Sequence, residues 1–494
     1  MRRLRHPSPP VGGEGKGASL TGLSFQPLFY LLVLSALRGA LYLAAVPPWQ
    51  NPDEPTHFEY AALAAAGRPA ADPRPDLVLQ KKIILSLDQH RFWEYEGLQR
   101  PDPLPATFAE TPLLKEVPTQ IGRKPFLYYL LASFPLRLVP ERPLAFQLYL
   151  LRSLSLLFTL GTIVAIWSTA RLVLPADPVF PFAAAAAAAF VPQFILAGTS
   201  AGPDALSNLL CAWIIFLAIA VAVRGISLPR LLSAVAVTLL AVLTTYKSLE
   251  IVPVLFAGIA LSVFRPGTKK RRTAAGAVSL LVLIALYSAL VWTTPGTVRV
   301  VMARLADLGE NLSGWLRGEA RVAARSYPGF HRELFRSFWV KFGWARFSLP
   351  AWYYAITASA SLAAAGGLVF SLLSVVAAAF RPRAISQAEA RGCPITAQCR
   401  GDDRARWRPV CLLLLACLCA LAGYYGYWGL QPRISTVQGR HLFPAISAWA
   451  ILFVLGGREI VAPRWRNAVS GAILGLLAVL DAIAIFLFIF PTFR

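Results

Sequence analysis

The sequence predicts an all-α polytopic membrane protein, and composition and periodicity both support this. Of its 494 residues, 56% are hydrophobic and only 15% are charged. Apolar runs of about 20 residues recur along the whole chain, and each is long enough to cross a bilayer core of about 30 Å. We therefore expect about eleven transmembrane helices, at about 26–46, 151–170, 180–198, 204–223, 231–246, 250–264, 274–294, 351–380, 409–428, 442–456 and 467–490.

The charge distribution sets the expected orientation. The formal net charge is +23, but no basic helix with base-reading residues is present, so we expect no nucleic-acid partner. The basic residues fall mostly in loops, where the positive-inside rule places them in the cytoplasm. The short run 124–139 contains Pro135 and Arg137. Whether it spans the membrane decides on which side all later loops lie. If it does not span, the basic loops 265–272 and 381–408 are cytoplasmic. This favours eleven spans, with a cytoplasmic amino terminus and an outward carboxyl terminus.

The first outer connection carries the most informative stretch, Pro47–Tyr60. It places Asp53, Glu54 and His57 at the membrane surface in a segment that four prolines stiffen. Ionisable groups at the end of a spanning helix are costly to hold there and indicate a functional site. The alternative is that Asp53 caps a helix beginning near Pro55. A cap would leave Glu54 and His57 unexplained.

The other outer connections also bring polar groups to the membrane boundary. Asp204 follows the second outer turn, Lys247 and Glu250 lie in the third, and Arg440 and His441 lie in the last. Each has a plainer interpretation, in which Asp204 is an N-cap, Lys247 pairs with Glu250, and Arg440 extends to lipid headgroups. Together they suit group transfer from a lipid phosphate. A carboxylate can act as general base on an acceptor hydroxyl, and cations can neutralise the departing phosphate.

A further outer loop, 295–350, is dense in arginine and aromatic residues. Its second half reads Ser337-Phe338-Trp339 and then Phe342-Gly343-Trp344. Aromatic side chains mixed with cations suit the headgroup zone of a membrane, and they also suit stacking on a sugar. Both interpretations stay open. A helix that lies in the membrane interface is expected over Leu77–Gly97.

The pattern Asp53-Glu54-x-x-His57-Phe58 resembles the first outer loop of the GT-C superfamily of membrane glycosyltransferases. The nearest members are polyprenyl-phosphate-mannose protein mannosyltransferases and lipid A aminoarabinose transferases, together with a bacterial polytopic family of unknown function that is treated as GT-C-like. The remaining matches are Lys124-Pro125-Phe126-Leu127-Tyr128-Tyr129, Arg152, Asp204, Lys247, Ser337-Phe338-Trp339 with Phe342-Gly343-Trp344, and Gln438-Gly439-Arg440-His441-x-x-Pro444.

The resemblance implies an inverting glycosyltransferase that moves a sugar from a polyprenyl-phosphate carrier to a glycan or lipid acceptor on the outer face. Asp53 would be the base, Glu54 would assist it or hold the acceptor, and Lys247 and Arg440 would bind the carrier phosphate. The full substrate-binding set would be His57, Lys124, Tyr128, Arg152, Asp204, Lys247, Arg440 and His441.

Some GT-C enzymes use a divalent metal such as Mg or Mn, and others do not. Asp53, Glu54, His57 and Asp204 could ligate one here, although their spacing does not require it. The Gly/Pro-rich, basic composition of residues 1–25 predicts a disordered cytoplasmic tail, and the resemblance covers a catalytic transmembrane module at 26–456. A basic loop and the last helix would follow at 457–494.

Two other classes of function stay open at this stage. A transporter or flippase of lipid-linked sugars would show internal repeats and broken helices with charges near the bilayer midplane. The sequence shows no convincing repeat, and its clear mid-span acid is Asp481. A non-catalytic scaffold would not need the carboxylates of the first outer loop.

Overall fold

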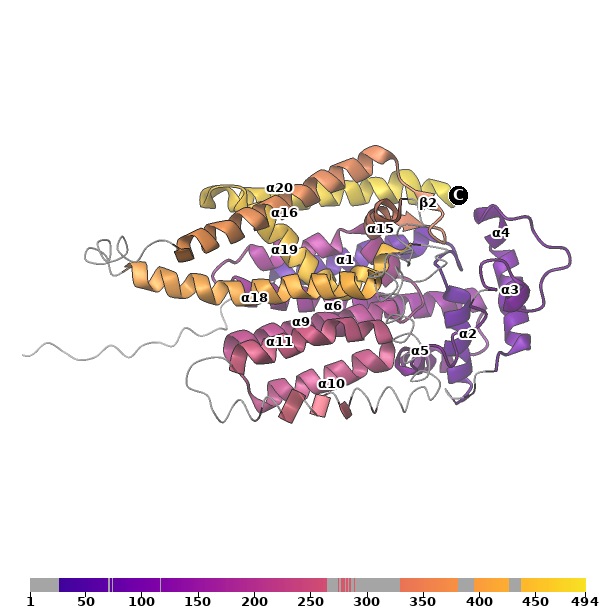
Figure 1. Cartoon of the computed structure of the whole chain (residues 1–494). Coiled ribbons are helices and arrows are strands. Elements are labelled where there is room, and N and C mark those ends of the chain that lie inside the picture. Colours follow the sequence, from indigo (N-terminus) through magenta and orange to yellow (C-terminus); the bar gives the residue numbers. More distant parts are fainter. Residues whose placement is uncertain are drawn as a thin grey trace, which may run out of the picture.

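The computed structural model shows an all-α, multi-pass membrane protein whose long helices run side by side (Figure 1). The large side chains on the outside of the bundle are apolar. Phe29 is 62% exposed and Leu362 is 74% exposed, as expected for helices that face lipid. The structure describes residues 26–69, 72, 74–115, 117–263, scattered residues between 274 and 288, 329–380, 395–425 and 437–494.

Within these residues, eight helices are long and apolar enough to cross a membrane, or nine with one bent pair. The eight are α1 (Gln26–Ala45), α6 (Leu144–Val173), α9 (Asp204–Arg224), η3 with α11 (Tyr246–Ile251, Val252–Val263), α16 (Ala351–Phe380), the second part of α18 (Ile395–Tyr424), η5 with α19 (Gly439–Ala445, Ile446–Glu459), and η6, α20, η7 and α21 (Pro463–Trp465, Arg466–Ile483, Ala484–Ile489, Phe490–Thr492).

Two more of the eleven predicted spans correspond to helices that are shorter or broken. Helix α10 (Leu228–Thr244) has 17 residues, which gives a length of about 25 Å. The predicted span 180–198 is the bent pair, α7 (Phe180–Ala189) and α8 (Pro192–Gly198), which meet at 68°. Most of the predicted span 274–294, and also the tail 1–25, lie outside the described residues.

The bend between α7 and α8 has a local cause. Pro192 has no backbone N–H and disfavours helical geometry at the residue before it, and Val191 has extended dihedrals, φ −76° and ψ 115°. The helix therefore stops at Ala189, and the Ala189 carbonyl accepts a hydrogen bond from Arg38 of α1. Arg38 also holds Asp481 of α20, with Nε to Oδ2 at 2.7 Å. The mid-span acid therefore belongs to a buried ion pair between the first and last spans.

The first outer connection, the segment between α1 and α6 that the sequence predicts to be outside, contains α2 (Glu54–Ala65), α3 (Leu77–Gln89), α4 (Phe92–Tyr95), η2 (Phe108–Glu110) and α5 (Leu127–Arg137). Helix α5 has 11 residues and is about 16 Å long, too short for a bilayer core. It packs against α2. The short helix is therefore consistent with the prediction that residues 124–139 do not span the membrane. The predicted helix over Leu77–Gly97 forms as α3 and α4, separated at Arg91, which has φ 56°.

The second large outer segment ends in α15 (Phe330–Trp339) and a small hairpin. Strand β1 (Lys341–Phe342) pairs antiparallel with β2 (Phe347–Ser348). The Nε1 of Trp344, in the hairpin turn, donates to the carbonyl of Trp49 at 3.0 Å, which joins the two outer segments. Phe338 and Trp339 are buried and pack on Trp449. These two aromatic side chains therefore belong to the protein core, neither to an interfacial belt nor to a sugar-stacking face.

Candidate functional site

Asp53 occupies an unusual backbone position where the first outer connection enters α2. It stands at the N-cap position with φ 65°, and its side chain makes no capping hydrogen bond. The cap interpretation of Asp53 is therefore wrong. Left-handed geometry is tolerated by aspartate but disfavoured for most residues, and such strained positions cluster at functional sites. The carboxylate is 38% exposed, and its Oδ2 lies 3.2 Å from Nη2 of Arg440.

Arg440 brings the last outer connection to this carboxylate. It is the second residue of η5, and its side chain is only 10% exposed. Its Nε also lies 3.8 Å from Oδ2 of Asp204 and has no hydrogen-bond acceptor among the described residues. The guanidinium therefore turns into the protein between two carboxylates. The alternative in which Arg440 extends to lipid headgroups is wrong.

Lys247 and His441 complete the cationic side of the site. Nζ of Lys247 lies 3.6 Å from Oδ1 of Asp204 and 2.5 Å from Nδ1 of His441. Asp204 is the first residue of α9, with Pro203 at the N-cap position and no capping hydrogen bond from a side chain. The structure thus uses Asp204 to hold Lys247 and Arg440 and not as an N-cap. It also gives Lys247 a partner other than Glu250.

Glu54, next to Asp53, has a different environment. It forms a two-point ion pair with Arg152 of α6, at 2.8 and 2.7 Å, and both side chains are fully buried. Arg152 also donates to the carbonyls of Val46 and Pro47, the two residues that follow α1. This geometry suits a positioning role for Glu54 and Arg152, whereas the catalytic and substrate-binding roles that the resemblance implied stay predictions.

His57 lies one turn into α2 and is buried. Its Nδ1 is 2.8 Å from the hydroxyl of Tyr129, which stacks on Tyr60. Burial is the main cause that lowers the pKa of His57 to about 4; Lys124 and Arg440 also lower it, and Asp53 opposes them. The imidazole is therefore neutral at physiological pH.

Gly202, in the turn before α9, lies against the His57 ring. A Cβ added there would come within 3.2 Å of the ring's Cδ2. The turn thus approaches the imidazole more closely than most side chains would permit.

Tyr128 is buried, and burial raises the pKa of its hydroxyl. Its hydroxyl lies 3.5 Å from the hydroxyl of Ser155 in α6. Tyr128 therefore packs against α6.

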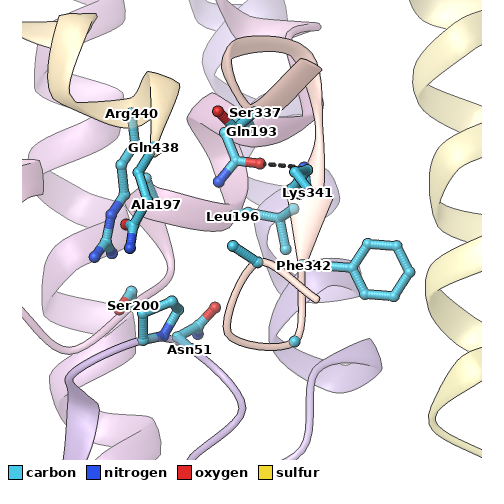
Figure 2. A pocket seen from close by; sticks show the side chains of 13 residues that line it. Asn51, Gln193, Leu196, Ala197, Ser200, Ser337, Lys341, Phe342, Gln438 and Arg440 are labelled. Atoms are coloured by element: carbon cyan, nitrogen blue, oxygen red, sulfur yellow. Dashed lines mark hydrogen bonds between the residues drawn. The ribbon is translucent and has the colours of Figure 1, made fainter. Parts of the chain in front are cut away.

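A pocket lies beside Arg440 (Figure 2). It is narrow, with a cavity volume of about 20 Å³, and lies between the first outer connection, α8 and the β1–β2 hairpin. Its lining includes Asn51, Gln193, Ser200 and Arg440. Sequence reasoning missed Asn51, Gln193 and Tyr129. Two signals could have found Asn51 and Gln193, because Asn51 lies in the proline-rich stretch before the acids and Gln193 is a lone amide in an apolar run.

The site residues do not fit a divalent metal. Among the described residues, no three His, Cys, Asp or Glu side chains converge to hold an ion. Both Glu54 oxygens are bound by Arg152, and Asp53 and Asp204 each face a cation.

Comparison with known proteins returns fold similarity alone. No family model and no curated protein matches the chain. The oligosaccharyltransferase of Archaeoglobus fulgidus is 13% identical, with a TM-score of 0.47 over 94% of this chain and 55% of the other. The chain thus spans about half the length of that protein. ArnT from Cupriavidus metallidurans, bound to undecaprenyl phosphate, is 15% identical with a TM-score of 0.40, over 95% and 74% of the two chains.

Proposed function

We propose that the protein is an inverting membrane glycosyltransferase. It moves a sugar from a polyprenyl-phosphate carrier to a hydroxyl of a glycan or lipid acceptor, on the outer face of a bacterial inner membrane. The observation that carries this proposal is the geometry at Asp53. A part-exposed carboxylate, held in a left-handed conformation, lies beside a group of cations that the later outer connections supply.

The residues can perform this transfer in one displacement. The Asp53 carboxylate takes the proton of the acceptor hydroxyl as the hydroxyl oxygen attacks the anomeric carbon of the sugar. The bond between that carbon and the phosphate oxygen breaks, and its electron pair leaves with the phosphate. The carrier thereby gains one negative charge, which Arg440 and Lys247 neutralise. Attack from the face opposite the phosphate inverts the anomeric configuration.

The remaining groups of the site prepare these two partners. Asp204 lies between Lys247 and Arg440 and holds the two side chains close together. Both cations can therefore face the departing phosphate. The neutral His57 adds no positive charge beside Asp53 and therefore does not compete for the carboxylate. The Glu54–Arg152 pair fixes the backbone on which Asp53 stands. These contacts are the kind of preorganisation that lowers the barrier without rearrangement during the reaction.

A transporter of lipid-linked sugars is the second candidate, and one observation favours it. The α7–α8 span is broken at 68°, and broken spans beside charged groups occur in transporters. Here the nearby charges, Arg38 and Asp481, satisfy each other and the freed Ala189 carbonyl. They hold the break in place and leave no charge for a transported ion. Glycosyl transfer therefore accounts for more of the buried polar contacts.

The test uses purified protein in lipid nanodiscs, with radiolabelled polyprenyl-phosphate sugars as donors and a membrane extract as acceptor. We expect Asp53→Asn to lower transfer at least 10²-fold, the usual effect of removing a general base, and to leave carrier binding within about threefold. Asp102→Asn is the matched control, because Asp102 is an exposed acid of the same outer connection. Transfer by Asp53→Asn at the wild-type rate would exclude the role given to Asp53. Movement of the intact carrier across liposomes by both proteins, without transfer, would support the transporter.

A further inference from the structure

A second pocket lies at the end of the helix bundle away from Asp53. Helix α6 begins at the first outer connection and ends at Val173, and α19 begins at η5, which carries Arg440, and ends at Glu459. The residues after these two helices therefore lie at the opposite end, and Figure 1 shows α20 running from there toward α3 and α4. The pocket has a cavity volume of about 330 Å³. About 150 Å³ is enough for a benzene molecule, so this pocket has room for a phosphate group and the small alcohol esterified to it.

Two arginines line this pocket, and both carry N–H groups without an acceptor. Arg458, in the last turn of α19, is 3% exposed. A guanidinium has five N–H donors, and Nη2 of Arg458 donates to the carboxylate of Asp177 and to the amide oxygen of Asn467 at 3.4 Å. Nε and Nη1 of Arg458, and Nε of Arg466 at the start of α20, have no hydrogen-bond partner in the described part of the chain. Buried donors without an acceptor are costly, so these groups indicate an acceptor that comes from outside the protein.

The acids that line the pocket are already paired. Asp177 accepts from Arg458 through Oδ2 and from two backbone N–H groups at the start of α7 through Oδ1. Oε2 of Glu459 lies 2.8 Å from Nη2 of Arg466. Within the described residues, the lining atoms that are buried without a partner are therefore donors on two cations. An anion suits such donors best, and a phosphate has enough acceptor oxygens to bind both arginines together.

The surroundings of the pocket favour a lipid as the source of that phosphate. Ile460 and Trp465, which neighbour lining residues in the sequence, are each 55% exposed. Tryptophan near the end of a spanning helix lies at the level of the lipid headgroups, and basic pockets between spanning helices bind such headgroups. Leu174 and Leu455 add apolar surface to the lining, against which the first carbons of a lipid chain can pack.

We propose that this pocket is a structural lipid site, which binds the phosphodiester of a membrane phospholipid with Arg458 and Arg466 donating to the phosphate. The bound phosphate then bridges α19 and α20. Because α19 follows directly on η5, which carries Arg440, the lipid fixes a helix on which the candidate site depends. Lipid binding here is independent of the reaction proposed for Asp53, and it can be measured without that reaction.

The experiment titrates the detergent-solubilised full chain with phosphatidylglycerol and measures bound lipid by native mass spectrometry. Diacylglycerol with the same chains, which lacks the phosphate, is the comparator and should bind at least tenfold more weakly. We expect Arg466→Gln to weaken binding of phosphatidylglycerol about tenfold. Arg464→Gln makes the same chemical change at an exposed arginine that is not part of the pocket lining, and it should leave binding unchanged. Lipid held by the apolar belt binds all of these proteins equally, so a difference between them reports the pocket.

A second variant tests Arg458 without leaving an unpaired acid. Arg458→Gln alone would leave Asp177 without its cation. Asp177→Asn/Arg458→Gln avoids this, because asparagine still accepts from the start of α7, and it should also weaken lipid binding about tenfold. A ligand that binds the folded state stabilises it. Phosphatidylglycerol should therefore raise the melting temperature of the wild type and of Arg464→Gln, and should raise that of the two pocket variants much less.

Three results would overturn the inference. The first is equal binding of phosphatidylglycerol and diacylglycerol by the wild type. The second is wild-type lipid binding by both pocket variants. The third is the same loss in Arg464→Gln as in Arg466→Gln, which would show attraction by surface charge in place of a built site. Inorganic phosphate should not displace the lipid at millimolar concentration. If it binds while phosphatidylglycerol does not, the lipid assignment is wrong and the pocket is a site for free phosphate.

Discussion

The fully buried pair of Glu54 and Arg152 allows the sharpest test of how the site is held. Arg152→Met would leave the Glu54 carboxylate buried without its cation, and Glu54→Leu would leave the guanidinium without its anion. Removing one partner of a buried ion pair costs about 3–5 kcal/mol, because an uncompensated charge remains in a low-dielectric site. Each single variant should therefore lose about 4 kcal/mol of stability.

The double variant Glu54→Leu/Arg152→Met should lose much less than the sum of the single variants. It leaves no buried charge. It does leave three backbone groups without their side-chain partners, the carbonyls of Val46 and Pro47 and the N–H of Ala201. At about 1 kcal/mol for each lost hydrogen bond, the double variant should lose about 3 kcal/mol, against about 8 for the summed singles.

Unfolding in mixed micelles, followed by tryptophan fluorescence, measures these free energies, and the transfer assay measures function in the same samples. All three variants should lose transfer, because the backbone that carries Asp53 loses its anchor. Additive losses, near 8 kcal/mol in the double variant, would refute the coupling that we infer. Glu54→Gln with wild-type stability and carrier binding but no transfer would return Glu54 to a catalytic role.

Three further predictions address other parts of the molecule. Asp481→Leu should lose about 3–5 kcal/mol because Arg38 is then buried unpaired, and Arg38→Met/Asp481→Leu should recover part of it in the same unfolding assay. Burial raises the pKa of Glu59 from 4.5 to about 7. The folded state therefore keeps a proton that the unfolded chain releases, and stability falls as pH rises from about 4.5 to about 7, by about 3 kcal/mol. Glu59→Gln should remove that dependence, and an unchanged slope would contradict it. Arg440→Lys should lower kcat about 10²-fold, since a lysine cannot contact Asp53 and the phosphate as a planar fork, and an unchanged kcat would place the phosphate elsewhere.

Much of the fold could be predicted from the sequence because lipid imposes a simple rule. A spanning segment must be apolar and about 20 residues long, so α1, α9 and α16 are visible as runs of apolar residues. The sequence predicted 180–198 as one unbroken span, and the 68° bend before Pro192 was not predicted. Arg38 and Asp481 lie 443 positions apart. No local pattern could pair them, and Asp481 therefore looked like an isolated acid.

In the candidate site, too, the sequence shows which residues are ionisable but not which of them meet in space. Outer connections could be recognised one by one as carriers of ionisable residues, and four of these residues, Asp53, Asp204, Lys247 and Arg440, do meet. The sequence could not divide the roles of Asp53 and Glu54, because the two are adjacent carboxylates with the same chemistry. The division comes from the backbone. A φ of 65° at Asp53 turns one carboxylate toward Arg440 and the open side, while the next residue begins α2 and points inward to Arg152. One dihedral angle thus separates the proposed base from its anchor, and only tertiary packing sets that angle.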